Sequence, residues 1–284
     1  MKKFIIIICL LICVTSLISS QDLFRIVVEN DLMKLEAAIE NGVNVNTRDD
    51  DGNTPLYAAS LIGANELIRC LLNAGADVHA RNIEGRTALH WAAKSAPLDT
   101  ILMLLDAGAD IDPADKYGIT PAIISAQSNL DPGVAKLFIE AGAYDPDEEN
   151  DLLSISLKSA AYNYNAEVVG LYLPLVRDIN AFDILGQTML MEAARFNPNE
   201  DVTSLLIEQG ADINLADSNG MTALLYAAKY NHNPAVIETL LDAGAKAAIR
   251  NNEGESALDY AAENEYINRS PAFWALNDGF YSGF

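Results

Sequence analysis

The sequence is poor in the residue types on which most enzymes and metal sites depend. Its 284 residues include only three histidines, His79, His90 and His232, and three cysteines. It contains no glycine-rich phosphate loop and no cysteines or histidines at metal-ligand spacing. A nucleophile–base pair would arise only by accident. We therefore expect a non-enzymatic protein that uses no cofactor and no metal.

Basic residues are also scarce, with 18 lysines and arginines against 40 acidic residues and a formal charge of −22. Nucleic acid and anionic membrane surfaces would be repelled. The charge has two readings, attraction to a basic partner or simple solubility of a long exposed chain. The acidic run from Asp145 to Asp151 could attract Ca²⁺, but it lacks the glycine and terminal glutamate of a calcium loop, so a solvated loop is the simpler reading.

The N-terminus is typical of a secretory signal peptide. A basic start, Met1 to Lys3, precedes an apolar stretch from Phe4 to Ile18, which is shorter than the roughly 20 residues that span a bilayer. We expect cleavage near Ser20, which would change the formal charge from −22 to −24. The alternative is an uncleaved anchor in the inner membrane.

Of the three cysteines, Cys9 and Cys13 lie inside this apolar stretch. Each follows an isoleucine rather than the small residue that a lipoprotein cleavage box requires, so lipidation is not expected. The processed chain would keep only Cys70, which excludes an intrachain disulfide. Cys70 is interpreted as a packing residue on a helix rather than as a reactive thiol.

The main positive feature is a repeat. A glycine followed two residues later by Thr or Ser, and then by an alanine-containing apolar segment, recurs at Gly52, Gly85, Gly118, Gly186, Gly220 and Gly254. The separations are 33, 33, 68, 34 and 34 residues, and the longest is two periods with one eroded unit between them. A fixed period of this size predicts an elongated solenoid in which each unit is stabilised by its neighbours.

Each period predicts two helices. The Thr or Ser (Thr54, Thr87, Thr120, Thr188, Thr222, Ser256) can cap the first helix, and Pro55 and Pro121 suit its first turn. Pairs of alanines keep that helix small on one face, and pairs of large apolar residues give the second helix its bulk. A second set of glycines then suits a left-handed helix stop: Gly75, Gly108, Gly142, Gly210 and Gly244.

These residues resemble the ankyrin repeat family. Thr54-Pro55-Leu56-Tyr57 and Thr87-Ala88-Leu89-His90 are close to the family's Thr-Pro-Leu-His element, and Gly-Ala-Asp turns follow the second helices at Gly75, Gly108 and Gly210. The tetratricopeptide repeat has a similar period, but its spaced Trp, Gly and Tyr are missing. The resemblance implies an all-α ankyrin-repeat solenoid of helix-turn-helix units joined by hairpin-like loops, with His90 ordering its turn.

The resemblance covers residues 21–284 as a single domain after a signal peptide at 1–20. An N-terminal half-matching repeat at 21–51 is followed by full units starting near 52, 85, 118, 152, 186 and 220, and a C-terminal cap at 254–284. The unit near 152 is degenerate, because Leu152 and Val176 stand where its two glycines should be. We expect distorted turns near 145–154 and near Val176, with Ser154 keeping the cap position.

In ankyrin-like stacks, the residues flanking the turn glycine and those just beyond the alanine pair face a concave groove. These slots include Arg195 and Lys229, and large apolar residues gather in them from the third full unit to the sixth. The candidate partner-binding residues are Tyr117, Ile119, Ile184, Leu185, Phe196, Met221 and Tyr230. The alternative is that some of them pack against neighbouring loops.

The expected function is that of an exported, monomeric protein–protein interaction module, periplasmic or secreted, which holds one protein partner on its concave face. One alternative is a non-selective protective or chaperone-like acidic scaffold of the cell envelope. A third reading is an effector exported to a host cell. A selective binder should concentrate apolar and aromatic side chains on an exposed face, whereas a general shield should not.

Overall fold

The computed structural model describes residues 20–143 and 149–282, and this part of the chain is helical throughout, without a strand. A single isolated β-bridge joins Arg250 and Ser256. No helix in the described ranges combines the length and the apolar character needed to cross a membrane. The predicted signal peptide lies outside the described residues, apart from its last residue, Ser20, and so does the 145–148 part of the acidic run.

The helices fall into two compact units, Met1–Ile124 and Ser125–Phe284. The first contains α2 (Ser20–Val28), α3 (Leu32–Glu40), α4 (Pro55–Leu61), α5 (Asn65–Asn73), α6 (Ala88–Ser95), α7 (Leu98–Asp106) and the first half of α8 (Pro121–Ser128). The second contains α9 (Pro132–Glu140), α10 (Glu149–Tyr162), α11 (Ala166–Tyr172), the 3₁₀ turn η1 (Leu173–Leu175), α12 (Met189–Phe196), α13 (Glu200–Glu208), α14 (Ala223–Tyr230), α15 (Pro234–Asp242), α16 (Ala257–Glu263) and α17 (Pro271–Ser282).

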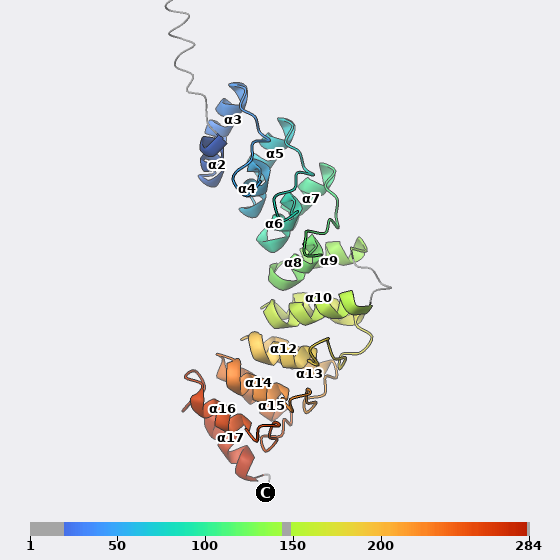
Figure 1. Ribbon diagram of the computed structural model, residues 1–284, viewed down its shortest axis with the longest axis vertical. Coiled ribbons are helices and arrows are strands. Elements are labelled where there is room, and N and C mark those ends of the chain that lie inside the picture. Colours follow the sequence, from blue (N-terminus) through green and yellow to red (C-terminus); the bar gives the residue numbers. More distant parts are fainter. Residues whose placement is uncertain (1–19, 144–148, 283–284) are drawn as a thin grey trace, which may run out of the picture. The chain divides into compact units, whose positions relative to one another are not determined.

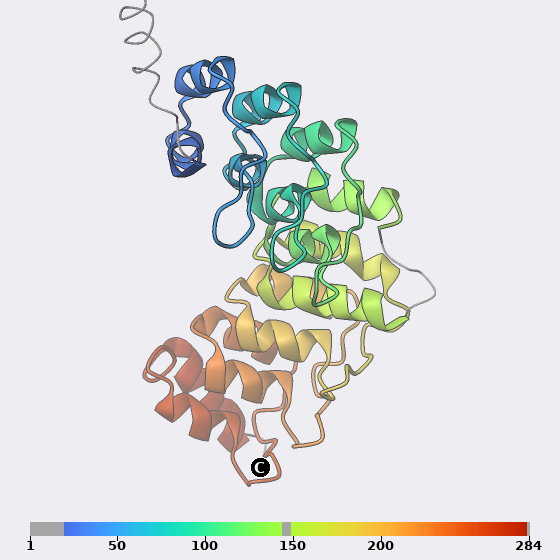
Figure 2. The same cartoon turned by 45° about the horizontal axis from the view of Figure 1, so that its top comes forward.

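Within each unit the helices form two rows (Figures 1 and 2). In the first unit α2, α4 and α6 pack in one row and α3, α5 and α7 in the other. In the second unit the first row is α10, α12, α14 and α16, and the second row is α9, α11, α13, α15 and α17. Each helix pair thus packs on its neighbours in both rows, and the predicted all-α stack of helix-turn-helix repeats is confirmed.

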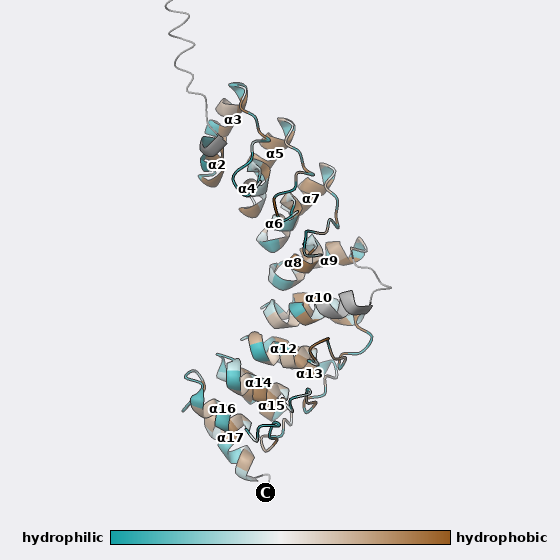
Figure 3. Ribbon diagram, viewed as in Figure 1, coloured by the Kyte–Doolittle hydropathy of each residue, from teal (hydrophilic) through white to brown (hydrophobic). Residues whose placement is uncertain are grey.

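The first-row helices begin where the sequence predicts. Thr54, Thr188 and Ser256 each accept a hydrogen bond from the backbone N–H three residues later, at 3.3–3.4 Å. The alanine pairs of α6, α12 and α14 are buried, with Ala193 and Ala194 at 0% exposure. Figure 3 shows apolar residues concentrated on helices such as α5 and α15 and polar residues in the connecting loops. Because alanine side chains are small, the first-row helices can pack closely and exclude water from the core.

Six second-row helices, α3, α5, α7, α9, α13 and α15, are each followed by a left-handed glycine. The φ angle of Gly210 is +95°, which places it in the region that glycine occupies without strain. An added Cβ at Gly210 would meet no atom within 4 Å, so only its φ angle favours glycine. Gly220, which lies in the loop before α14, also has a positive φ angle, but its surroundings differ. An added Cβ there would lie 3.1 Å from both Asn251 Cα and Asn252 N.

A ladder of asparagines joins the repeats of the second unit. Asn197 is fully buried, and its side-chain amide donates to the carbonyls of Ala160 and Asn163 at 2.9 and 2.8 Å. The same two bonds recur, each reaching back to the preceding repeat, at Asn163, Asn231 and Asn264. We call these four residues the asparagine ladder. They satisfy backbone carbonyls that would otherwise be buried without a donor.

The degenerate repeat differs from the expectation at its first turn. Helix α10 already begins at Glu149, so Ser154 lies inside the helix and the predicted cap there is wrong. Without a glycine at position 152, nothing forces a turn, and the helix extends toward its N-terminus by more than one and a half turns. At the second turn the expected distortion is present. Helix α11 continues directly into η1, and Val176, which follows η1, has a φ angle of −90° instead of the positive φ of a glycine stop.

Candidate functional site

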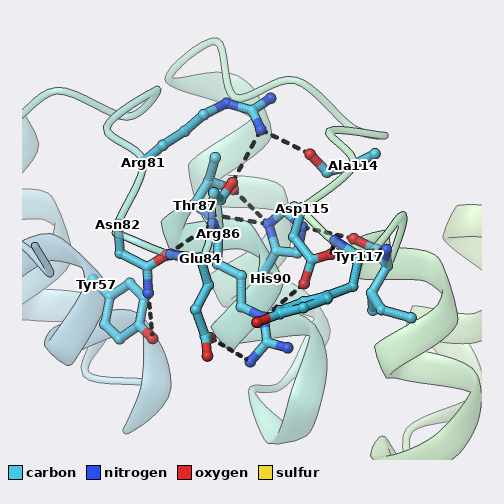
Figure 4. A network of polar contacts seen from close by, with 12 residues as sticks. Tyr57, Arg81, Asn82, Glu84, Arg86, Thr87, His90, Ala114, Asp115 and Tyr117 are labelled. Atoms are coloured by element: carbon cyan, nitrogen blue, oxygen red, sulfur yellow. Dashed lines mark hydrogen bonds and ion pairs between the residues drawn. The ribbon is translucent and has the colours of Figure 1, made fainter. Parts of the chain in front are cut away.

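The first two candidate residues lie in a hairpin-like loop of the first unit. Tyr117 is 72% exposed at its tip, whereas Ile119 is half-buried. Asp115 shapes the loop by accepting backbone hydrogen bonds from Tyr117 and Ile119 at 2.8 and 2.9 Å. Arg86 from the preceding repeat donates to the same carboxylate at 2.9 Å (Figure 4). The loop therefore presents Tyr117 on a rigid base.

His90 supports the same loop through hydrogen bonds at both of its ring nitrogens. Its Nδ1 accepts from the Thr87 backbone N–H at 3.0 Å, and its Nε2 lies 3.2 Å from the Ile119 carbonyl (Figure 4). An accepting Nδ1 requires the neutral ring, with the proton on Nε2. Burial lowers the pKa of His90 to about 4, which keeps this neutral form. The imidazole is structural here, as the resemblance implied.

Asp115 remains charged in this network. Burial disfavours its carboxylate, but the hydrogen bonds from Arg86, Ile119 and Tyr117 outweigh burial and lower its pKa. Arg86 is also 3.1 Å from Glu84. Because His90 and Asp115 are both fully engaged with the turn, we assign them to loop positioning and not to chemistry on a ligand.

Ile184 and Leu185 form the corresponding loop tip in the second unit. Their side chains are 96% and 69% exposed. Asp183 holds the loop by accepting from the backbone N–H groups of Leu185 and Gln187, both at 2.8 Å. Nothing among the described residues covers these two side chains, which agrees with their expected exposure.

Met221 does not belong to an exposed face. It is 7% exposed and packs in the core of the second unit. Its backbone N–H donates to Asp217 at 2.8 Å, and its sulfur lies 3.6 Å from the Asn251 amide of the next repeat. The residue after this turn glycine is thus drawn under the next loop, and Met221 is removed from the candidate set.

Phe196 and Tyr230 stand at the C-terminal ends of α12 and α14 and belong to a larger cluster. The Tyr162 and Phe196 ring centroids are 5.4 Å apart, and those of Tyr226 and Tyr230 are 6.2 Å apart. Arg195 joins the two pairs, because its guanidinium carbon lies 4.6 Å from the Phe196 centroid and 4.8 Å from that of Tyr230. We call Tyr162, Arg195, Phe196, Tyr226, Lys229 and Tyr230 the aromatic ladder.

The ladder is partly exposed and braced from within. Tyr162, Phe196 and Tyr230 are 47%, 39% and 40% exposed. Tyr226 is buried, and its hydroxyl donates to Asp217 at 2.8 Å and accepts from Gln187 at 2.6 Å. Burial, with the Asp217 hydrogen bond second, raises the Tyr226 pKa to about 12. The exposed rings therefore stand on a fixed polar network that connects neighbouring loops.

Lys229 extends the ladder toward the C-terminal repeat. Its ammonium lies 5.4 Å from the Tyr230 centroid and 4.4 Å from that of Tyr260. Although burial lowers the pKa of Lys229, the two tyrosines outweigh it, and the net pKa is raised. Glu192 approaches the ladder from α12, and burial raises its pKa despite the opposing effect of Arg195.

A hollow of about 490 Å³ opens at the other end of the ladder. Leu130, Tyr162 and Tyr164 line it, together with Gln127 and Ser128. Leu130 and Tyr164 are 55% and 57% exposed. Since Tyr162 belongs both to the hollow and to the ladder, the two form one continuous aromatic surface on the second unit.

Sequence reasoning identified Phe196 and Tyr230 but missed Tyr162 and Tyr226. The missing signal was the period itself, because Tyr162, Phe196 and Tyr230 stand 34 residues apart. Arg195 and Lys229 were placed on the groove face but not among the binding candidates. The structure brings Phe196 and Tyr230 together, whereas Ile184 and Leu185 lie beyond the opposite end of α12, and Tyr117 and Ile119 belong to the first unit.

Repeated helix pairs that display exposed side chains on braced loops and helix ends define a class of protein, the helical-repeat interaction scaffold. The family model for ankyrin repeats (3 copies) matches residues 23–115, 157–250 and 190–276. The chain therefore belongs to the ankyrin repeat family.

Among solved structures, the chain is similar to the human ASB11 ankyrin repeat domain, with a TM-score of 0.50 and 24% sequence identity. The alignment covers 90% of this chain and 96% of that chain, and it supports the fold. No curated protein sequence matches this chain. Ankyrin repeats are generally protein–protein interaction modules and typically non-enzymatic.

Proposed function

We propose that this protein is an exported interaction module that binds one protein partner on the concave face of its second unit, as a monomer. The observation that carries the proposal is the aromatic ladder. Three large rings at 39–47% exposure recur in equivalent positions of consecutive repeats. Aromatic side chains are enriched at the centres of protein interfaces, and tyrosines are frequent among the residues that dominate the binding energy.

The ladder also favours selective binding over general shielding. A non-selective acidic scaffold needs charge and solubility but no cluster of exposed rings, which would be an aggregation liability without a partner. The formal charge of −22 supports a partner that is basic over most of its surface. Ile184 and Leu185 provide a second exposed apolar contact beyond the far end of α12.

Affinity purification from the native cell envelope, with mass spectrometry of the retained proteins, would identify the partner. An alanine series then tests the face. Phe196→Ala and Tyr230→Ala should each weaken partner binding by roughly 30-fold, which corresponds to about 2 kcal/mol. Their melting temperatures should change little, because both side chains are partly exposed.

The matched control is Trp274→Ala, since Trp274 is 58% exposed on α17, in the second row and away from the ladder. It should leave partner binding unchanged. The proposal is wrong if Phe196→Ala and Tyr230→Ala lower thermal stability but retain wild-type binding.

Export has its own test. The basic start and apolar stretch at residues 1–18 support secretion with cleavage near Ser20. The intact mass of the protein recovered from the periplasm or medium should then lack the first 20 residues. Recovery of the full-length mass in the membrane fraction would instead show an anchored protein.

A further inference from the structure

We propose that the aromatic ladder binds an extended partner segment that places carboxylates at Arg195 and Lys229 and an apolar side chain in the hollow beside Tyr162. This inference rests on the proposed function, because it takes the ladder as the binding face. It adds the chemistry of the segment that binds there, which the net charge of the protein does not suggest.

No carboxylate among residues 20–143 and 149–282 forms an ion pair with Arg195. Its guanidinium is held by the uncharged rings of Phe196, Tyr226 and Tyr230, at 4.6, 5.5 and 4.8 Å from their centroids. Its Nε is buried and has no hydrogen-bond acceptor in the part of the chain that the structure describes.

Two other cations of the second unit are paired with carboxylates. Lys136 lies 3.7 Å from Glu140, and Arg250 lies 3.1 Å from Asp259. Over the described ranges, no carboxylate comes within 4.0 Å of Arg195 or Lys229. The lack of a carboxylate partner is common for exposed cations, but the Arg195 Nε is also buried without an acceptor among the described residues. Stacking on aromatic rings fixes a guanidinium in place while leaving N–H donors for a carboxylate, which they fit in a planar fork.

The nearby acidic side chains of the protein do not supply this carboxylate to Arg195. Asp217 accepts from the Tyr226 hydroxyl and from two backbone N–H groups, and Asp183 accepts from two others. Glu192 lies one turn before Arg195 on the same helix, but its carboxylate is not within 4.0 Å of the guanidinium, and burial raises its pKa. The local surface is therefore more positive than the chain as a whole, and the Debye length of about 8 Å at physiological salt screens the distant acids.

The repeat spacing sets the positions along the partner segment. The hollow lies between the α8 and α10 repeats, Arg195 between the rings of α12 and α14, and Lys229 between those of α14 and α16. Packed helices are about 8–10 Å apart, and an extended strand rises about 3.3 Å per residue. The first carboxylate should follow the apolar residue by about five or six positions, and the second should come about three positions later.

A peptide-display selection against the full-length protein tests this directly. Random dodecapeptides are selected on the wild-type protein, and enriched sequences are resynthesised with free or amidated carboxyl ends to distinguish side-chain from terminal carboxylates. Their dissociation constants are measured for wild type, Arg195→Met, Lys229→Met and Tyr164→Ala. Lys136→Met is the control, because it removes one positive charge from α9, outside the ladder.

We expect enriched peptides that carry an apolar residue and two acidic residues at the spacing above. Arg195→Met should weaken their binding at least about tenfold and Lys136→Met should not, since the loss of a paired interfacial charge is costly. Replacing the peptide Glu by Gln should remove most of this difference between wild type and Arg195→Met.

Enrichment of basic or uncharged peptides would overturn the inference, and so would no enrichment at all. Equal losses of peptide binding in Arg195→Met and Lys136→Met would also overturn it. The proposed function is tested by a different result from the one that tests this inference. If the native partner is captured through Phe196 and Tyr230 while acidic peptides do not bind, the binding face stands and only the carboxylate chemistry is wrong.

Discussion

At the scale of single residues, His90 shows how a polar side chain can be built into a core. Its ring is 1% exposed and is fixed by hydrogen bonds at both nitrogens, to Thr87 and to Ile119 of the next repeat. Protonation would place a second donor against the Thr87 N–H. The ring can therefore hold the turn only while it is neutral.

This geometry predicts a pH dependence of stability. The pKa of His90 falls from 6.5 to about 4 on folding, so between these values the unfolded chain binds one more proton than the folded one. Stability should be complete above about pH 6.5 and fall by up to about 3 kcal/mol as the pH drops to 4. Chemical denaturation across this range measures the effect, with His90→Gln as the control. A variant whose stability falls as steeply as that of wild type between pH 6.5 and 4 would contradict the assignment.

Substitutions at two glycines allow the energetic cost of an unfavourable backbone conformation to be measured separately from the cost of a steric clash. Gly210→Ala should cost about 1–2 kcal/mol, the penalty of a left-handed L-residue, since its Cβ meets empty space. Gly220→Ala carries the same penalty and also presses on the backbone of Asn251 and Asn252, which should add about 1–3 kcal/mol. Urea unfolding of both variants compares them, and equal losses would mean that the loop shifts freely.

At the scale of elements, the asparagine ladder explains how one helix pair recognises the next. A buried face of alanines is small and smooth, so it tolerates sliding between repeats. The directional bonds from each asparagine to two carbonyls of the preceding repeat fix the register. The first unit has Ala96 and Pro97 at the corresponding turn of its α6–α7 pair, so the ladder belongs to the second unit.

Loss of one member of the ladder should be costly. Asn197→Ala leaves the carbonyls of Ala160 and Asn163 buried without that donor, which should lower the free energy of unfolding by about 2–4 kcal/mol. Asn214→Ala is the matched control. Asn214 also makes two bonds to the following repeat, at 3.3 and 2.9 Å, but they are solvent-exposed. We expect less than about 1 kcal/mol there, and similar losses at both sites in denaturant titrations would argue against the ladder.

At the scale of the whole molecule, stability in a repeat protein is a sum of unit and neighbour terms, so a weak unit opens first. Helix α11 has 7 residues and ends in a 3₁₀ turn, whereas α13 and α15 each have 9 residues followed by a left-handed glycine. The degenerate pair is therefore the weakest pair expected inside the second unit.

Hydrogen exchange should show this directly. Amides of residues 166–176 should exchange before those of 200–208 and 234–242, which serve as internal references in the same sample. The sequence predicts distorted turns near 145–154 and near Val176, and the described structure points to α11 and η1 as the part of this repeat that opens first. Uniform protection of the three helices would refute the prediction.

The repeat identity, the helix pairs, the Thr caps and the glycine stops could all be predicted from the sequence. Each depends on local chemistry that recurs with a period of 33 or 34 residues, so a single unit already carries the signal. The start of α10 could not be predicted, because losing a glycine permits either a strained turn or a longer helix, and packing decides between them.

The candidate site divides in the same way. The sequence alone determined which positions flank the turn glycines and follow the alanine pairs, and that large apolar residues gather there. Only the tertiary structure decided that Met221 is buried under the next loop, that Tyr162 joins Phe196 and Tyr230, and that Arg195 is held by rings from two helices. These outcomes depend on distances between residues of different repeats, and the period of the sequence does not contain those distances.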